Sequence, residues 1–438
     1  MTLSRAWTLL RRSRVGLTFW TLVAAQGCSD DDEASTDEPV PSTGRYAGCT
    51  TVIKAGSDAE AIQTALIEAK TKSVVCFADG EYKLDRELSS TVNDITVRGN
   101  PGDRRAVVLD YTAQVEGKDA LSASGAGFTI EHLSVRNSHG NAIVVKNTDR
   151  VTFRNLFVSW SVGSATTNGA YAVYPLSCRD VLVENCEVVG ASDAGLYVGQ
   201  SQNIIVRNNT VHGNVTGIEI ENSDDALVTG NRVYDNTAGI LVFVMPNLER
   251  KSGARTIVEE NRIDDNNRAN FGAPGTTVSV VPAGVGVLVL ANDGTEVREN
   301  SFSGNKSAGV LAISLSTYET ICAAGGGESC QSNDTRTDRD LSKLYVHDND
   351  FSGNGLDPDE TVRALFEPPI ENVLWDGRKP ADAQGEDQFC LGPNGTSVRK
   401  FGDQNGFHAS RALDTTDPKA FACTLPPPFA EIELPQDT

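Results

Sequence analysis

Two glutamates separated by one residue, Glu219 and Glu221, stand in a strand-like stretch that reads TGIEIEN. Alternate residues of a strand point to the same side, so the two side chains should lie roughly 6.5–7 Å apart. That separation suits an inverting glycosidase pair, in which one carboxyl donates a proton and the other activates water. Asp193 and Tyr197 are expected close to this pair. We therefore take Glu219, Glu221, Asp193 and Tyr197 as candidate catalytic residues.

Aromatic and basic residues supply candidates for substrate binding. Tyr174 is expected in line with Tyr197 and Glu219, with Lys146 preceding it on the same outward face. Aromatic faces beside carboxylates suit sugar rings, and Arg207 is placed to neutralise a uronate. The competing interpretation is that an outward strand face carries alternate charged residues because water covers it, since perturbed environments are not visible in a sequence.

Two isolated histidines, His139 and His212, are further candidates for a general base, although lone exposed histidines mostly have no such role. No cofactor or metal motif is evident. The cysteines form no Cys-x-x-Cys pair and have no histidine at zinc spacing. The glycine-rich calcium repeat is also absent, so Ca²⁺ bound by carboxylates stays an open alternative.

A repeated sequence must position these residues. Between Val181 and Phe243 the chain reads VLVENCEVVG then AGLYVGQ, IIVRNNTVHGN then TGIEIEN, and ALVTGNRVYDN then AGILVFV. Each copy contains three short strands joined by turns and is too small to bury its own apolar face, so copies must stack. The pattern predicts an all-β fold, a single-stranded right-handed parallel β-helix. The handedness follows from the general rule for parallel crossovers.

Matching positions of successive coils should become neighbours in space. One column consists of turn asparagines that can bond to one another along the stack: Asn209, Asn231, Asn261, Asn300 and Asn349. An inward aliphatic column runs through Ile143, Val173, Leu196, Ile218, Ile240, Val287 and Val310. An outward apolar stripe consists of Leu241, Phe243, Leu288, Leu290, Leu311 and Ile313. That stripe is too large to be left bare, so we expect the chain's own insertions and tail to cover it; a partner protein is the alternative.

The chain divides into four regions by composition and pattern. They are a signal peptide (1–27), an acidic tether (28–47), the β-helix (48–375) and an irregular C-terminal strap (376–438). A capping helix is expected over residues 57–69, at the start of the β-helix. Three insertions, 245–255, 266–282 and 316–341, interrupt the coils.

The N-terminus predicts export. A basic region precedes an apolar stretch that is too short to span a bilayer, and Cys28 then follows in a lipoprotein-like context. We expect lipidation of Cys28 and anchoring to a bacterial membrane, at the periplasmic face or the cell surface. Ordinary secretory cleavage after Ala25 or Gly27, giving a periplasmic or secreted protein, is the alternative. The net charge of -21 argues against nucleic acid as a partner.

The remaining cysteines are even in number, as disulfides in an exported chain require. Local closure gives the simplest pairing: Cys49–Cys76, Cys322–Cys330 and Cys390–Cys423. Cys186 falls in a buried column and is expected to be a free apolar thiol.

Several segments resemble a bacterial family of exported tandem β-helix-repeat proteins. They read NGAYAVYP (168–175), ASDAGLYVGQSQNIIVRNN (191–209), GIEIENS (217–223), AGILVFVMPNL (238–248) and VPAGVGVLVL (281–290). The resemblance implies a pectin-lyase-like right-handed β-helix and a signal peptide. It also implies a c-type cytochrome encoded nearby, and it implies no established reaction. Polysaccharide lyases, hydrolases and epimerases are common on this fold, which favours sugars by analogy alone.

Two hypotheses follow. The first is a monomeric, envelope-anchored protein that binds an extracellular polysaccharide along Tyr174, Tyr197 and Glu219, and processes it as a lyase, hydrolase or epimerase. The second is a non-catalytic scaffold that docks a periplasmic protein, such as a c-type cytochrome, on the apolar stripe. Burial of that stripe by the chain's own residues would separate the two.

Overall fold

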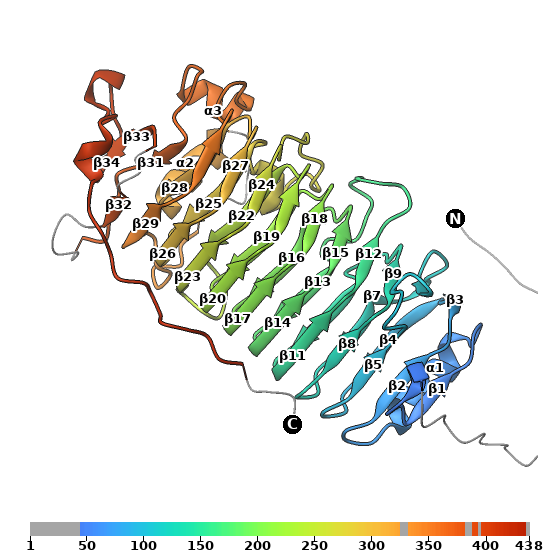
Figure 1. Cartoon of the computed structure of the whole chain (residues 1–438). Helices are drawn as coiled ribbons and strands as arrows, with labels where there is room; N and C mark the ends of the chain where they lie inside the picture. Colours follow the sequence, from blue (N-terminus) through green and yellow to red (C-terminus); the bar gives the residue numbers. More distant parts are fainter. Residues whose placement is uncertain (1–43, 325–331, 382–387, 393–395, 435–438) are drawn as a thin grey trace, which may run out of the picture. The chain divides into compact units, whose positions relative to one another are not determined.

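The computed structural model describes residues 44–324, 332–381, 388–392 and 396–434 (Figure 1). The signal peptide, Cys28 and most of the acidic tether lie outside these residues. Within them, no helix combines the length and the apolar character needed to cross a membrane. The strands pair in parallel in three long sheets, one for each strand of a coil, so the predicted parallel β-helix is confirmed.

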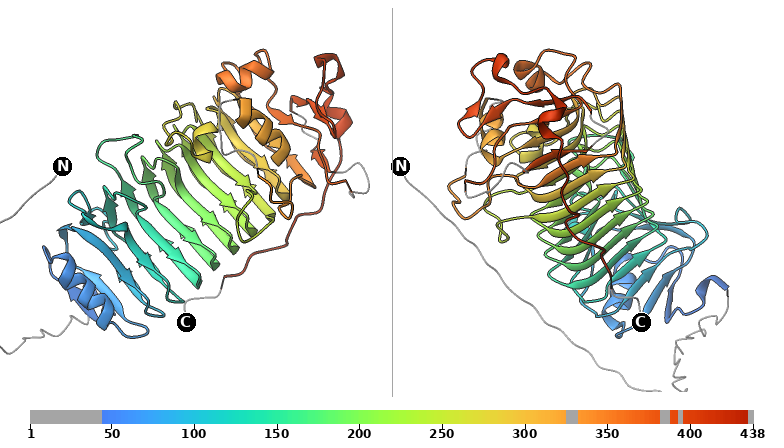
Figure 2. Two further views of the ribbon diagram at one scale, coloured as in Figure 1. Left: turned by 180° about the vertical axis from the view of Figure 1, so that it is seen from behind. Right: turned by 60° about the vertical axis from the view of Figure 1, so that its left-hand side comes forward.

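The three sheets run the length of the helix (Figure 2). The twelve-stranded sheet contains β1 (Thr51–Ile53), β2 (Val74–Phe77), β5 (Thr96–Arg98), β8 (Thr129–Glu131), β11 (Asp149–Arg154), β14 (Arg179–Glu184), β17 (Gln202–Arg207), β20 (Asp224–Thr229), β23 (Ala254–Glu259), β26 (Asp293–Arg298), β29 (Leu344–His347) and β32 (Phe389–Leu391). The ten-stranded sheet contains β3 (Gly80–Lys83), β6 (Val107–Asp110), β9 (Ser134–Arg136), β12 (Phe157–Ser159), β15 (Glu187–Val189), β18 (Thr210–His212), β21 (Arg232–Tyr234), β24 (Arg262–Asp264), β27 (Ser301–Ser303) and β30 (Asp350–Ser352).

The eleven-stranded sheet carries the candidate site. It contains β4 (Arg86–Ser90), β7 (Glu116–Ala123), β10 (Ile143–Lys146), β13 (Val173–Leu176), β16 (Ala194–Gly199), β19 (Thr216–Glu221), β22 (Ala238–Phe243), β25 (Val285–Leu290), β28 (Ala308–Ile313), β31 (Val373–Trp375) and β33 (Val398–Lys400). Strands β34 (Gly402–Asp403) and β35 (Gly406–Phe407) form a separate antiparallel pair.

The interior of the helix is filled by aliphatic columns. The predicted column is in register from Ile143 to Val310, through each successive pairing of the eleven-stranded sheet, and every member is fully buried. Side chains alternate along a strand, so a one-residue slip would turn this column outward. Burial of the column therefore fixes which residues face the solvent side of the sheet.

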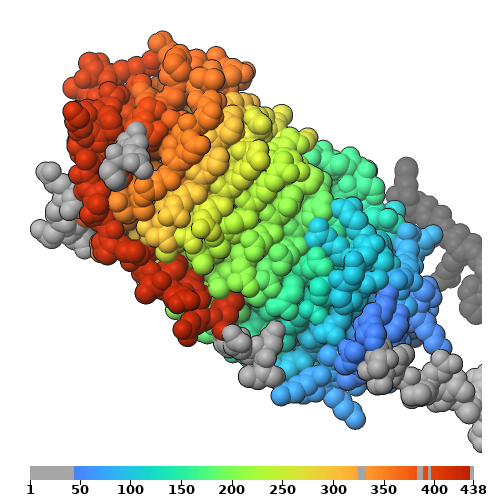
Figure 3. All heavy atoms as spheres, in the orientation of Figure 1, coloured from blue at the N-terminus to red at the C-terminus, as the bar shows by residue number. Residues whose placement is uncertain are grey.

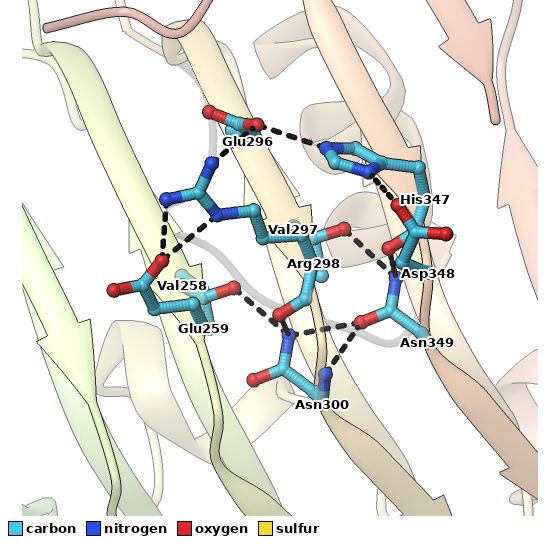
Figure 4. A network of polar contacts seen from close by, with 9 residues as sticks. All are labelled: Val258, Glu259, Glu296, Val297, Arg298, Asn300, His347, Asp348 and Asn349. Atoms are coloured by element: carbon cyan, nitrogen blue, oxygen red, sulfur yellow. Dashed lines mark hydrogen bonds and ion pairs between the residues drawn. The ribbon is translucent and has the colours of Figure 1, made fainter. Parts of the chain in front are cut away.

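The predicted asparagine column is a hydrogen-bonded ladder. Asn209 Nδ2 donates to Asn231 Oδ1 and Asn231 Nδ2 to Asn261 Oδ1, each at 2.9 Å. The ladder continues through Asn300 to Asn349 at 3.0 Å per step, and Figure 4 shows its last step. The neighbouring Asn208 has a φ of 56°, the left-handed conformation that asparagine tolerates at turns.

A second ladder, which the sequence analysis missed, stands five residues further along each coil. Its members are Asn214, Asn236, Asn266, Asn305 and Asn354, with amide contacts of 3.0–3.1 Å. The constant offset from the first column was the signal that could have revealed it. The two ladders stabilise two of the turns in the coils from Asn209 to Asn354 against slippage between coils.

The first coil is capped as predicted. Helix α1 (Ala59–Glu68) packs Ile62 and Leu66 into the end of the core, and the Asp58 side chain accepts a hydrogen bond from the Ala61 amide at 2.9 Å. The disulfide Cys49–Cys76 forms beside this cap.

The other predicted cysteine assignments agree with the structure where it describes them. Cys390–Cys423 forms, and Cys186 is a buried free thiol, as is Cys178. Cys322 is disulfide-bonded, while its predicted partner Cys330 lies outside the described residues. Disulfides of this kind indicate an exported protein, because they persist in oxidising compartments.

The chain's own insertions and tail cover the outward apolar stripe, as predicted. All six stripe residues are buried, and they pack with Val281 of one insertion and with Phe401 of the tail. Two helices that the sequence analysis missed contribute to the cover, α2 (Leu315–Ala324) and α3 (Glu360–Leu365). The surface on which the scaffold hypothesis depended is therefore occupied by this chain itself.

The C-terminal region differs from the expected boundary at residue 375. Strands β32 and β33 lie beyond that position and add a last strand to two of the sheets, where the expected region was irregular. Short strands with polar neighbours, such as Val398-Arg-Lys400, do not show the repeat pattern. After Cys423 the chain runs as an extended strap over the outside of the coils (Figure 3), and the carbonyl of Glu433 accepts a hydrogen bond from the Asn203 side chain at 3.1 Å.

The ladder makes a testable prediction about stability. In Asn231→Ala, the Asn209 amide and the Val206 carbonyl lose their side-chain partners inside the fold. Buried groups without partners should lower the free energy of unfolding by roughly 2–4 kcal/mol. Denaturant unfolding of the full chain measures this loss. Asn405→Ala, at an exposed position, is the matched control and should stay within about 0.5 kcal/mol. Equal stability of the two variants would contradict a stabilising ladder.

Candidate functional site

The register of the eleven-stranded sheet brings the candidate residues side by side. Tyr197 pairs with Glu219 on the next coil, and Gly199 pairs with Glu221. The ring centroids of Tyr174 and Tyr197 are 4.8 Å apart. Residues that are 22 or more positions apart in sequence therefore form one continuous surface on the outside of the sheet.

A glycine makes room for the contact between Tyr197 and Glu221. The Tyr197 hydroxyl donates a hydrogen bond to Glu221 Oε2, on the next coil. A Cβ atom on Gly199 would lie 2.1 Å from that hydroxyl, so any side chain at position 199 would displace the tyrosine ring. Gly199 is thus a positioning residue that the sequence analysis missed. An isolated glycine inside a strand is the signal that could have found it.

Asp193 belongs to the same cluster through a tyrosine that was also missed. Tyr171 hydrogen-bonds to the Asp193 carboxylate. Its ring packs against those of both Tyr174 and Tyr197, with centroids 4.6 and 4.8 Å away, so the three rings form a triangle. Tyr171 stands three residues before Tyr174. A second tyrosine so close in the sequence is the feature that could have identified it as part of the site.

These side chains line a cavity of about 400 Å³ on the outer face of the sheet. Its wall contains Tyr171, Asp193, Tyr197, Glu219, Glu221, Leu241 and Phe243. The opposite wall comes from residues 275–278 of the second insertion and from Tyr318 of α2, and the Tyr318 hydroxyl bonds to Thr277. The insertions that interrupt the repeat therefore complete the cavity.

Burial raises the pKa of all three carboxyl groups. Burial raises the pKa of Asp193 to about 7, although the Tyr171 hydroxyl opposes the change. Burial likewise raises the pKa of Glu221 to about 7, against the opposing bond from Tyr197. The pKa of Glu219 lies well above its ordinary value, because burial and then the Asp193 charge disfavour its ionised form. No arginine, lysine or histidine is among the described residues that line this cavity.

Several outward carboxylates elsewhere in this protein are paired with arginines. On the twelve-stranded sheet, Arg154 bridges Glu131 and Glu184, and Arg207 contacts the other oxygen of Glu184 at 2.6 Å. We call this set, which begins with Arg98 against Glu131, the arginine–glutamate row. Figure 4 shows the same chemistry further along, where Arg298 bonds to Glu259 and Glu296 and His347 bonds to Glu296. The carboxylates of the cavity are unlike these because they have no cationic partner.

Three expected binding residues do not line the cavity. Arg207 lies on the twelve-stranded sheet, a different face of the helix, where it pairs with Glu184. Val144, and not Lys146, is in register with Tyr174. The Lys146 ammonium nevertheless lies 5.2 Å from the Tyr174 ring centroid, and both residues stand next to the cavity and not in its wall.

The histidines lie elsewhere. His212 stacks on Tyr234 of the ten-stranded sheet, and His139 is exposed in a turn. In the described part of the chain, no group of three or more histidine, cysteine, aspartate or glutamate residues could hold a metal ion. Carboxyl and phenol groups are therefore the chemistry that the cavity offers.

Comparison with known proteins agrees with the architecture. A family model described as a right-handed β-helix region matches residues 119–244 and 163–323. No curated protein sequence matches the chain. Together with the three parallel sheets, the family match defines the chain as a right-handed parallel β-helix protein.

Several solved structures are similar at low identity. The A-module of a mannuronan C-5 epimerase of Azotobacter vinelandii is 16% identical, with 70% of this chain and 88% of that chain covered and a TM-score of 0.40. An alginate lyase of a Paenibacillus species is 13% identical, with coverage of 70% and 97% and a TM-score of 0.38. Endopolygalacturonase I of Stereum purpureum is 15% identical, with coverage of 70% and 92% and a TM-score of 0.39.

The raised carboxyl pKa values predict how stability depends on pH. A carboxyl group whose pKa is higher in the folded state stabilises the fold at low pH, and this contribution is lost as pH rises through the folded pKa. For Glu221 the stabilising contribution is lost between pH 4.5, its ordinary pKa, and about pH 7, its pKa in the folded state. Glu221→Gln keeps an acceptor for Tyr197 and should gain on the order of 2 kcal/mol relative to wild type between pH 5 and pH 8.

Unfolding free energies at the two pH values measure this gain. Glu68→Gln, at an exposed position near the end of α1, is the control and should show the pH dependence of wild type. The same pH dependence in Glu221→Gln as in wild type would show that Glu221 has an ordinary pKa.

Proposed function

We propose that the protein binds a polysaccharide in this cavity and hydrolyses it. The observation that carries the proposal is one cavity lined by the buried carboxyl group of Glu219, by the half-buried carboxyl groups of Asp193 and Glu221, and by the faces of tyrosines. Perturbed carboxyl groups gathered in a cavity are typical of sites of acid–base chemistry. Aromatic rings beside them suit the faces of sugar rings.

The surroundings of the two glutamates suggest separate roles. Glu219 is 4% exposed, and burial raises its pKa well above the ordinary value, so it serves as the general acid. Glu221 ionises at about pH 7 and is partly exposed, so it serves as the general base. Glu219 donates its proton to the glycosidic oxygen as the glycosidic bond breaks. Glu221 takes a proton from the water that attacks the anomeric carbon.

The charge of the cavity favours hydrolysis over uronate lyase or epimerase chemistry. A uronate carboxylate would need a positive group to offset three acidic side chains, and the described lining residues contain none. Protonation of a leaving oxygen needs no such group. We therefore place lyase and epimerase activity below hydrolysis for this site.

The assignment predicts distinct effects of two variants on the release of reducing ends from polysaccharides. Glu221→Gln should lose at least about 100-fold in kcat for every substrate that wild type cleaves, because the attacking water loses its base. Glu219→Gln should lose as much on natural linkages and far less on aryl glycosides whose leaving group departs without a proton.

Glu68→Gln is the matched control and should keep the wild-type rate. A wild-type protein that releases no reducing ends from neutral, basic or acidic polysaccharides would exclude hydrolysis. Activity that survives in Glu221→Gln would assign the reaction to another site.

We also propose that the protein is held at a bacterial membrane by a lipid on Cys28. The support is the sequence context of Cys28, followed by an acidic linker. In its bacterial host, the protein should partition into detergent with the membrane fraction, whereas Cys28→Ala should be released in soluble form. Mass spectrometry of the mature N-terminus decides the matter: an unmodified N-terminus produced by cleavage after Ala25 or Gly27 would contradict lipidation.

A further inference from the structure

The cavity has an unbalanced charge. Asp193, Glu219 and Glu221 all line it, and the three described contacts that they accept come from hydroxyl groups, not from cations. The titratable groups that face one another here are these three carboxyls with Tyr171, Tyr197 and, from α2, Tyr318. The nearest lysine identified, Lys146, lies behind Tyr174 and outside the wall.

One carboxylate oxygen is left without a partner. Glu219 Oε1 accepts a hydrogen bond from the Thr216 hydroxyl at 2.6 Å. Glu219 is 4% exposed, and its second oxygen has no hydrogen-bond partner among the described residues. This oxygen is not among the fully buried atoms without a partner, so a ligand that enters the cavity can donate a hydrogen bond to it.

The cavity differs in this respect from the arginine–glutamate row on the twelve-stranded sheet. The arginine–glutamate row shows that the same fold neutralises outward glutamates wherever arginines stand on the adjacent coil. At the cavity the adjacent positions hold Tyr197, Leu241 and Phe243 instead.

We propose that the sugar unit bound in this cavity carries a protonated amine, held as an ammonium group by the carboxylates of Asp193 and Glu221, beside the carboxyl group of Glu219 and the tyrosine rings. The ligand class is thus a polysaccharide of amino sugars with free amines. This inference rests on the proposed function and names the substrate class of the same site.

The chemistry of an ammonium group matches each element of the cavity. Its three N–H donors can reach more than one carboxylate oxygen, including the free oxygen of Glu219. Tyrosine faces attract cations through their quadrupole, and Tyr171 and Tyr197 present two rings side by side, 4.8 Å apart. A cationic ligand also favours the ionised form of the carboxyls, which an acidic ligand would oppose.

Binding of four probes tests the proposal with the full chain. They are the disaccharides of β-1,4-linked glucosamine, of N-acetylglucosamine and of galacturonate, and the tetramethylammonium ion. At pH 7, calorimetry should show that the glucosamine disaccharide binds at least about tenfold more tightly than its acetylated form, which has lost the charge. The galacturonate disaccharide should not bind.

Variants test whether the cavity determines the preference for glucosamine over N-acetylglucosamine. Asp193→Asn should lower the preference for glucosamine over N-acetylglucosamine by at least about threefold, because one of the charges that face the amine is removed. Glu68→Gln, which keeps the wild-type cavity, should retain the preference. If Asp193→Asn fails to fold, the comparison of disaccharide binding by the wild-type protein still tests whether the ligand carries an amine.

The outcomes separate this inference from the proposed function. Equal or tighter binding of the acetylated or the acidic disaccharide would contradict the proposal that the ligand carries an amine. The proposal that the cavity binds a glycan would stand. Binding of tetramethylammonium without any disaccharide would support a cation site and contradict a glycan ligand. The absence of all binding, together with the absence of reducing-end release, would overturn both.

Discussion

Everything in this molecule depends on the register between successive coils. A coil has three short strands and no core of its own, so its stability comes from parallel pairing with the coils on either side. Burial of the aliphatic column decides which face of each strand points inward, because a slip of one residue reverses every side chain. Two asparagine ladders then hold the turns at that register, with a contact of about 3 Å between each coil and the next.

The same register builds the site, and it does so at a cost in stability. Stacking places Tyr197, Glu219 and Leu241 in one row and Gly199, Glu221 and Phe243 in the next. Each carboxyl in these rows is surrounded by rings, aliphatic groups and other carboxyls. On the twelve-stranded sheet the identical spacing produces ion pairs, because arginines alternate with glutamates there. The fold therefore sets the distance between residues of adjacent coils. The residue types decide whether a row forms ion pairs or lines the cavity.

Periodicity allowed most of the fold to be predicted from the sequence. The aliphatic column, the first asparagine ladder, the capping helix and the covered apolar stripe all follow from patterns that repeat or from a single amphipathic segment. The second ladder repeats as regularly and was overlooked, although its five-residue offset was visible. Helices α2 and α3 were missed because they lie in insertions, where no repeat sets an expectation and tertiary cover decides the conformation.

The site was less predictable, for physical reasons. The register predicts that Tyr197 and Glu219 are neighbours. The sequence pattern does not say on which of the three faces of the helix Arg207 lies, nor which carboxylate shares that face. Tyr318 comes from α2, more than 100 residues after Tyr197, and only the packing of an insertion brings it to the cavity. The raised carboxyl pKa values depend on burial by that insertion, which no local pattern encodes.

The central claim is that a cavity without cations keeps carboxyl groups protonated near neutral pH. Infrared difference spectroscopy of the full chain across a pH titration measures carboxyl protonation directly. The account predicts a protonated-carboxyl band that loses intensity with a midpoint near pH 7 as Asp193 and Glu221 ionise, and this change is absent from the combined Asp193→Asn, Glu219→Gln, Glu221→Gln variant. Complete ionisation of every carboxyl group below pH 5 in the wild-type protein would contradict it.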